Sequence, residues 1–201
     1  MQSRLDPFTA TFLAYFCIAV IIKVRLFHIQ GGKAEILVDN WTFSAAFVSY
    51  MVVVTGSLYE YFFTGPQVIL PIAMLGYMTA TAGLMITRYS VRSLGPYWSV
   101  RIEVKRGHEI LVKGPYRFSR HPYYLATLLE LGGLCLILNS FWTLLYLSVA
   151  HIPILVARIQ SEERVLIASL GERYLAYRNR VPILPTLSSL KLGRGRNWST
   201  P

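Results

Sequence analysis

The chain has 201 residues, of which 54% are hydrophobic and 15% are charged, and its mean hydropathy is +0.44. A soluble domain cannot bury that much apolar surface, so the composition excludes an ordinary soluble fold and favours a membrane protein. The formal net charge of +10 does not require nucleic acid, because the basic residues gather between apolar runs, where membrane topology and anionic lipid explain them. Cys17 and Cys135 both lie inside apolar runs, which argues against a disulfide framework.

The N-terminal half contains three apolar runs, at residues 8–22, 41–59 and 68–87. A membrane-spanning helix takes about 20 mainly apolar residues, so each run predicts one span. The first run is short, but Lys23 and Arg25 can snorkel to the membrane surface, and no small-residue cleavage site follows it. The run therefore predicts a retained span, followed by a polar loop at residues 28–40. The turn signal between the second and third runs predicts an antiparallel hairpin.

Residues 88–120 form the only long polar segment inside the chain, with eight lysines and arginines. Gly95-Pro96 and Gly114-Pro115 argue against one continuous helix there. Residues 122–157 are apolar again, apart from Asn139-Ser140 in the middle, which predicts two helices joined by a short turn.

Ser161 has the side chain of a helix N-cap, and Glu162 and Glu163 after it suit the first turn of a helix. Apolar and aromatic residues then recur at helical spacing up to Tyr177. This pattern predicts a separate C-terminal amphipathic helix lying on the membrane or the bundle.

Five spans place alternate loops on the same side of the membrane. With this arrangement 19 of the 20 lysines and arginines fall on one side, and Arg4 alone falls on the other. The positive-inside rule then predicts an external N-terminus and a cytosolic C-terminus.

Titratable and hydrogen-bonding groups are concentrated at residues 108–124, between two apolar runs. Pro122 suits the first position of a helix and holds His121 in an extended conformation. The unpaired N–H groups and the positive end of the helix dipole make such a helix start a site for a carboxylate or a phosphate. A proline at a helix start is common, however, and by itself says little about function.

The order of motifs resembles that of the isoprenylcysteine carboxyl methyltransferases, integral membrane enzymes that use S-adenosylmethionine. The matching motifs are His108-x5-Gly114-x-Tyr116, Arg120-His121-Pro122-x-Tyr124, Arg158-x3-Glu162-Glu163 and Gly171-Glu172-x-Tyr174-x2-Tyr177-x2-Arg180-Val181-Pro182. The resemblance covers about residues 84–187. It implies an all-α integral membrane protein of about five transmembrane helices, with a cytosolic cofactor-binding loop. A three-span region (1–87), a catalytic region (88–187) and a flexible tail (188–201) would form a single structural domain.

The resemblance also implies site residues. Glu162 matches an acid that contacts S-adenosylmethionine, and Arg158 matches a catalytic arginine assigned to the substrate. The other residues implied to bind the cofactor are His108, Glu109, Ile110, Leu111, Tyr116, His121, Pro122, Tyr123 and Tyr124.

The chemistry of these residues fits the implied reaction. Glu162 can bind the ammonium of S-adenosylmethionine, and the helix start at His121 can bind its carboxylate. A substrate carboxylate, with a reference pKa of about 4, is ionised at pH 7, so methyl transfer needs alignment and exclusion of water more than a base. Arg158 would hold that carboxylate. The expected enzyme esterifies an isoprenylcysteine-like or other lipophilic acid arriving from the bilayer, at a site facing the cytosol, without metal or nucleic acid.

Three other interpretations stay open. Phospholipid N-methyltransferases share the Arg-His-Pro and Glu-Glu features, and membrane sterol reductases, which use a nicotinamide cofactor, share Arg-His-Pro-x-Tyr. A non-catalytic membrane scaffold is the third. Among single residues, Arg158 and Glu162 have the spacing of a helical salt bridge, and the tyrosines fit an aromatic belt at the interface. Glu130, an acid within a span, either functions or pairs with a donor such as His151.

Overall fold

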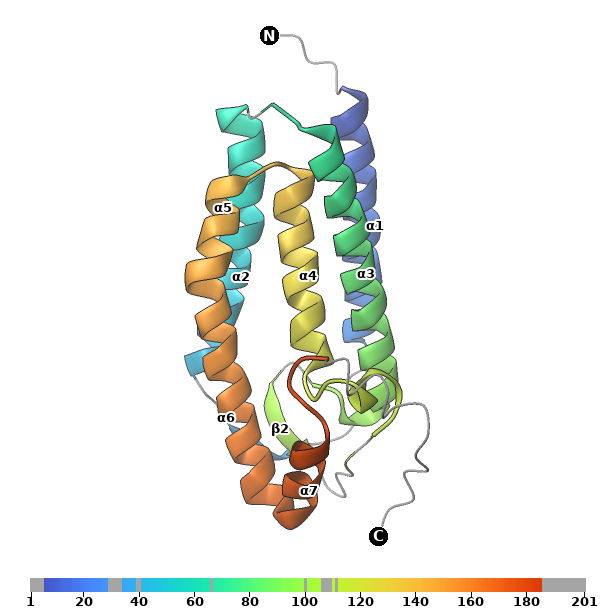
Figure 1. Cartoon of the computed structure of the whole chain (residues 1–201), viewed down its shortest axis with the longest axis vertical. Helices are drawn as coiled ribbons and strands as arrows, with labels where there is room; N and C mark the ends of the chain where they lie inside the picture. Colours follow the sequence, from blue (N-terminus) through green and yellow to red (C-terminus); the bar gives the residue numbers. More distant parts are fainter. Residues whose placement is uncertain are drawn as a thin grey trace.

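The computed structural model describes residues 6–28, 34–38, 41–65, 67–99, 101–105, 110 and 112–185. Long helices lie side by side along the main axis of the molecule (Figure 1). They are α1 (Pro7–Phe27), α2 (Trp41–Tyr59), α3 (Leu70–Leu94), α4 (Pro122–Ile137), α5 (Phe141–Tyr146) and α6 (Ile152–Leu170). The π-helical turn η1 (Glu60–Thr64) extends α2, a second one, η4 (Leu147–His151), joins α5 to α6, and α7 (Glu172–Arg180) folds back at the end of α6.

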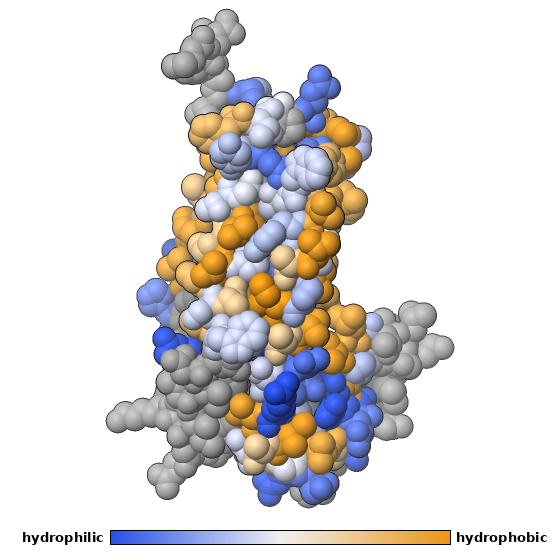
Figure 2. All heavy atoms as spheres, turned by 90° about the vertical axis from the view of Figure 1, so that its left-hand side faces the viewer, coloured by the Kyte–Doolittle hydropathy of each residue, from blue (hydrophilic) through white to orange (hydrophobic). Residues whose placement is uncertain are grey.

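Four helical segments are long and apolar enough to cross a membrane, namely Pro7–Leu26, Trp41–Thr64, Leu70–Leu94 and Phe141–Leu170. The fifth apolar helix, α4, has 16 residues and lies among the long ones (Figure 1). Large apolar side chains such as Val48, Met78 and Val149 are exposed on the bundle. Figure 2 shows hydrophobic side chains over much of the height of one face, with a hydrophilic cluster towards the lower end. The prediction of an all-α membrane protein is therefore confirmed.

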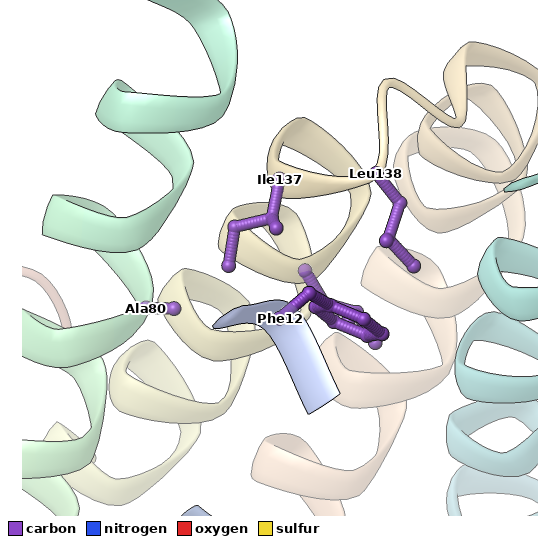
Figure 3. Close-up of a cluster of buried hydrophobic side chains, with 5 residues drawn as sticks. Phe12, Ala80, Ile137 and Leu138 are labelled. Atoms are coloured by element: carbon purple, nitrogen blue, oxygen red, sulfur yellow. The ribbon is translucent and has the colours of Figure 1, made fainter. Parts of the chain in front are cut away.

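Small residues let α3 and α4 approach closely. A Cβ on Gly76 would lie 2.5 Å from the backbone nitrogen of Ile137, and one on Gly133 would lie 2.6 Å from that of Ala80. Such close approach is the usual way in which helices associate in a membrane, where lipid removes the hydrophobic driving force between them. Beside this contact, Phe12 of α1 is fully buried with Ala80, Ile137 and Leu138 (Figure 3).

Polar groups close the end of the bundle at which α4 passes into α5. Asn139 adopts a left-handed backbone (φ 52°), and its side-chain oxygen accepts a 3.1 Å hydrogen bond from the backbone N–H of Ile69. The Glu60 carboxylate accepts hydrogen bonds from the backbone N–H groups of Trp142 and Thr143, at 3.2 and 2.6 Å, at the start of α5. Buried backbone groups need such partners, so these side chains fix the predicted short turn.

Two features differ from the sequence-based expectations. Strand β1 (Ala34–Val38) lies in the segment expected to be a polar loop, and it pairs antiparallel with β2 (Ile102–Lys105). Ser161 is not an N-cap, because α6 continues through it and its hydroxyl donates to the Ala157 carbonyl at 3.0 Å. The turn comes instead at Gly171, whose φ of +56° favours glycine. The prediction of a separate helix starting at Ser161 is therefore wrong.

Candidate active site

The loop before α4 is fastened to the C-terminal part of the described chain. The hydroxyl of Tyr177 in α7 donates to the Tyr116 carbonyl at 2.8 Å, and the backbone N–H of Arg120 donates to the Pro182 carbonyl at 3.0 Å. Burial raises the pKa of Tyr116 and Tyr177, so both stay protonated around neutral pH and Tyr177 can keep donating. These contacts set the position of the start of α4.

Glu163 joins three elements at this point. Its Oε1 lies 2.9 Å from Arg120 Nε and 3.2 Å from His121 Nε2, and its Oε2 lies 3.6 Å from Arg178 Nε. The residue is 8% exposed. A buried carboxylate surrounded by charged donors anchors α6 to the start of α4 and to α7.

Glu162 points the other way, towards the inside of the bundle. Its Oε2 accepts a 2.7 Å hydrogen bond from the Tyr124 hydroxyl and lies 3.9 Å from His121 Nδ1. The side chain is 29% exposed, so this carboxylate stays accessible while Glu163 does not. Tyr124 also hydrogen bonds Arg158, and its hydroxyl therefore links the acid and the arginine of the Arg-x3-Glu motif.

Arg158 is buried, with only 3% of its surface exposed. Its guanidinium carbon lies 5.4 Å from the centre of the Phe43 ring in α2, which is a cation–π distance. The aromatic ring and Tyr124 keep the planar group in one orientation.

Arg158 and Tyr124 line a cavity of about 210 Å³ between the helices. Its walls are mainly apolar and come from α1, α2, α4 and the η4–α6 segment. Further polar side chains line it, those of Lys23, Tyr50, Tyr123, Thr127 and His151. An apolar cavity with a few convergent polar groups is the usual form of a small-molecule site.

Lys23 and Glu130 form a largely buried ion pair next to this cavity, with side chains 17% and 12% exposed. Lys23 also donates to the Tyr50 hydroxyl at 3.3 Å, and Thr87 donates to Glu130 at 2.5 Å. Lys23 and Tyr50 line both the large cavity and a smaller, apolar one of about 70 Å³ deeper in the bundle. The expected snorkelling of Lys23 and the suggested pairing of Glu130 with His151 are therefore wrong, since both charges turn inward towards each other.

The structure brings together most of the predicted site residues that it describes. Those that meet at the start of α4 are Tyr116, His121, Pro122, Tyr124, Arg158 and Glu162. The His121 ring lies between two glutamates, so it orients carboxylates and is not itself positioned to hold an anion.

Two predicted residues lie to the side of this group. Tyr123 lines the cavity and packs edge-on against Trp98, with ring centres 5.8 Å apart. Ile110 packs against the Tyr174–Val181 cluster. His108, Glu109 and Leu111 lie outside the described residues.

Sequence reasoning missed Phe43, the position of His151 at the cavity and the inward turn of Lys23. An intramembrane lysine and an intramembrane glutamate of opposite charge were a usable signal for the last of these. Phe43 and His151 carried no such signal in the sequence, because their contacts form only when α2 packs beside the η4–α6 segment.

Comparison with known proteins bears on this site. Residues 69–168 match the model of the isoprenylcysteine carboxyl methyltransferase family. The chain is 33% identical to the uncharacterized protein YpbQ of Bacillus subtilis over 93 residues, covering 46% of this chain and 55% of YpbQ. It is 28% identical to the protein-S-isoprenylcysteine O-methyltransferase of Schizosaccharomyces pombe over 113 residues, or 53% of this chain and 48% of that one.

A third relative is the cobalt-zinc-cadmium resistance protein CzcN of Cupriavidus metallidurans, 30% identical over 101 residues, which cover 49% of this chain and 46% of CzcN. The chain thus spans about half the length of the curated relatives it matches. Within the described ranges, no three His, Cys, Asp or Glu side chains gather as metal ligands would.

Proposed function

Residues 69–168 belong to the isoprenylcysteine carboxyl methyltransferase family, and from that premise we propose that the chain uses S-adenosylmethionine to esterify the carboxylate of a lipophilic substrate. One observation supports this more than any other. The Tyr124 hydroxyl joins Glu162, an accessible acid, to Arg158, a buried cation, at the wall of an intramembrane cavity. A soluble cofactor at Glu162 and a membrane-borne acid at Arg158 would therefore bind next to each other.

The residues present fit S-adenosylmethionine. Its ammonium and sulfonium are cationic, and Glu162 offers them a partly exposed carboxylate whose position is fixed by Tyr124. Tyr116, held against α7, adds an apolar wall. We also propose that the residues around His108 and the turn from His121 to Tyr124 contact the cofactor. When bound, S-adenosylmethionine supplies an electrophilic methyl group.

Arg158 provides the substrate contact. A guanidinium that is 3% exposed and stacked on Phe43 has lost much of its hydration, so an incoming carboxylate gains a strong, paired hydrogen-bonding partner there. Held by one edge, the carboxylate keeps a free oxygen for attack, and the surrounding apolar walls exclude water. A neutral methyl ester no longer pairs with Arg158, which favours its release into the bilayer.

A buried cation beside the cavity disfavours the N-methylation alternative. An amine substrate carries a positive charge until it loses a proton, and Arg158 would repel it. A carboxylate substrate, in contrast, is attracted by that charge.

The test uses purified full-length protein, labelled S-adenosylmethionine and N-acetyl-S-farnesylcysteine. We expect transfer of label to a base-labile ester. Arg158→Ala should abolish turnover and leave cofactor binding near wild type, while Glu162→Ala should weaken cofactor binding. Arg173→Ala, on the exposed side of α7, is the matched control and should behave as wild type.

Two outcomes would contradict the proposal. One is absence of S-adenosylmethionine binding in the wild type. The other is a base-stable product together with normal turnover by Arg158→Ala, which would indicate N-methylation. Thermal shifts with NADPH and with S-adenosylmethionine separate the reductase interpretation from both.

A further inference from the structure

His151, in the turn that joins α5 to α6, has one ring nitrogen engaged and one not. Its Nδ1 lies 2.9 Å from the Ser49 hydroxyl, which in turn lies 3.2 Å from the Tyr146 hydroxyl. The residue is 1% exposed, and among the described residues no hydrogen-bond partner reaches its Nε2. His151 lines the same cavity as Arg158. Buried polar atoms normally have partners, so an orphaned ring nitrogen at a cavity wall indicates a ligand atom.

The chain of hydroxyls sets the tautomer of this histidine. We assign the Tyr146 hydroxyl as the donor to Ser49, because a phenol donates a hydrogen bond more readily than it accepts one. With this assignment the Ser49 hydroxyl donates to Nδ1 of His151, and the ring proton is assigned to Nε2. His151 therefore presents an N–H donor at the cavity.

We infer that His151 Nε2–H binds a second oxygen of the substrate, distinct from the carboxylate held by Arg158; this inference rests on the proposed function. The substrate class is accordingly a lipophilic acid with a carbonyl or ether oxygen near its carboxylate. A plain hydrocarbon tail in the same cavity would leave Nε2 without a partner.

The spacing along the helices fits such a substrate. The Arg158 guanidinium lies at the level of Phe43 and His151 at the level of Ser49, six residues further along α2. His151 and Arg158 are also seven residues apart along η4 and α6, a rise of about 10 Å, and both side chains line one cavity. A substrate that occupies the cavity therefore reaches both side chains at once, one oxygen at each.

Two probe acids with the same tail test the inference. N-acetyl-S-farnesylcysteine carries an amide carbonyl near its carboxylate, and 3-(farnesylthio)propanoic acid lacks the amide. We expect the wild type to prefer the first by about tenfold in kcat/KM, the size of one buried hydrogen bond. His151→Leu should lose this preference and His151→Gln, which keeps an N–H donor, should retain part of it.

Thermal unfolding and S-adenosylmethionine binding show that each variant is folded, because neither depends on the second oxygen. The inference is overturned if the wild type does not distinguish the two acids, or if His151→Leu lowers both rates equally, as expected for a histidine that only packs or holds water. Failure of the wild type to methylate either acid would contradict the proposed function itself, and this inference with it.

Discussion

At the scale of single residues, Glu162 and Glu163 are adjacent in sequence and have opposite surroundings. Glu163 is enclosed by Arg120, His121 and Arg178, while Glu162 is partly exposed and has the Tyr124 hydroxyl as its neighbour. Successive residues of a helix point about 100° apart, so one acid faces the C-terminal elements and the other faces the cavity side. Glu163 is therefore expected to contribute to stability, and Glu162 to ligand binding.

This division predicts different effects for two substitutions of the same type. Glu163→Gln removes the buried counter-charge of Arg120 and should lower the free energy of unfolding by about 3 kcal/mol. Glu162→Gln should unfold as the wild type does but bind S-adenosylmethionine about tenfold or more weakly, since a hydrogen bond to a charged group is lost. Thermal unfolding in detergent and calorimetric titration measure the two quantities. Equal loss of stability in both variants would contradict the assignment.

The Lys23–Glu130 pair supports a second prediction. Lys23→Met leaves Glu130 buried without its counter-charge and should cost about 3–5 kcal/mol. The double variant Lys23→Met/Glu130→Met removes both charges and should recover most of that loss. Chemical unfolding of the three proteins in the same detergent measures the coupling between the two sites. A single variant as stable as the wild type would contradict this prediction.

At the scale of elements, the contact of α3 with α4 depends on the absence of side chains. Gly133→Ala would force a methyl group against the Ala80 backbone and should destabilise the bundle by about 1–3 kcal/mol. Gly132→Ala is the matched control, because its Cβ would meet nothing within 4 Å, and it should be neutral or slightly stabilising. Melting temperatures of both variants in detergent decide this. The prediction fails if the two shift alike.

The helices could be predicted from the sequence because each is an apolar run of the right length. The antiparallel pairing of β1 with β2 could not be predicted, because both strands are short and lie more than 60 positions apart in the sequence. The prediction of a helix start at Ser161 failed for a physical reason. A serine followed by two acids is typical of a helix start, but here the preceding apolar turns continue α6 through it, and the acids face partners on α4 and α7.

The sequence predicted those residues of the candidate site that belong to recognisable motifs. Tyr124, Arg158 and Glu162 follow from motif order, whereas their mutual contact depends on the packing of α4 against α6. Phe43 and His151 belong to no motif, and only the placement of α2 gives them a role. Contacts between distant helices are the part that sequence patterns alone do not encode.

At the scale of the whole molecule, the two ends of the bundle differ in charge. The described residues at the end with α1 residue Pro7, η1 and the α4–α5 turn include Asp6 and Glu60 and no lysine or arginine. The opposite end, where α4 begins and α7 folds back (Figure 1), carries the residues of the candidate site together with basic residues. These include Arg88, Arg92, Arg117, Arg120, Arg164, Arg173, Arg178 and Arg180.

This asymmetry predicts the orientation of the protein in the membrane. By the positive-inside rule the basic end faces the cytosol. S-adenosylmethionine would then reach the candidate site from the cytosol. Thr64→Cys and Asn179→Cys place thiols at exposed positions on the two ends, while native Cys17 lies within α1 and Cys135 is buried. In spheroplasts of a bacterial host, a membrane-impermeant maleimide should label Thr64→Cys. Asn179→Cys should be labelled only after the membrane is permeabilised.

The wild-type chain, treated in the same way, controls for reaction at the native cysteines. Labelling of Asn179→Cys in intact spheroplasts, with Thr64→Cys protected, would place the Glu162 site outside the cell. The cofactor would then have no source, because the carboxylate of Glu162 and the basic residues around it lie at the same end of the bundle as Asn179. The orientation and the proposed use of S-adenosylmethionine therefore stand or fall together.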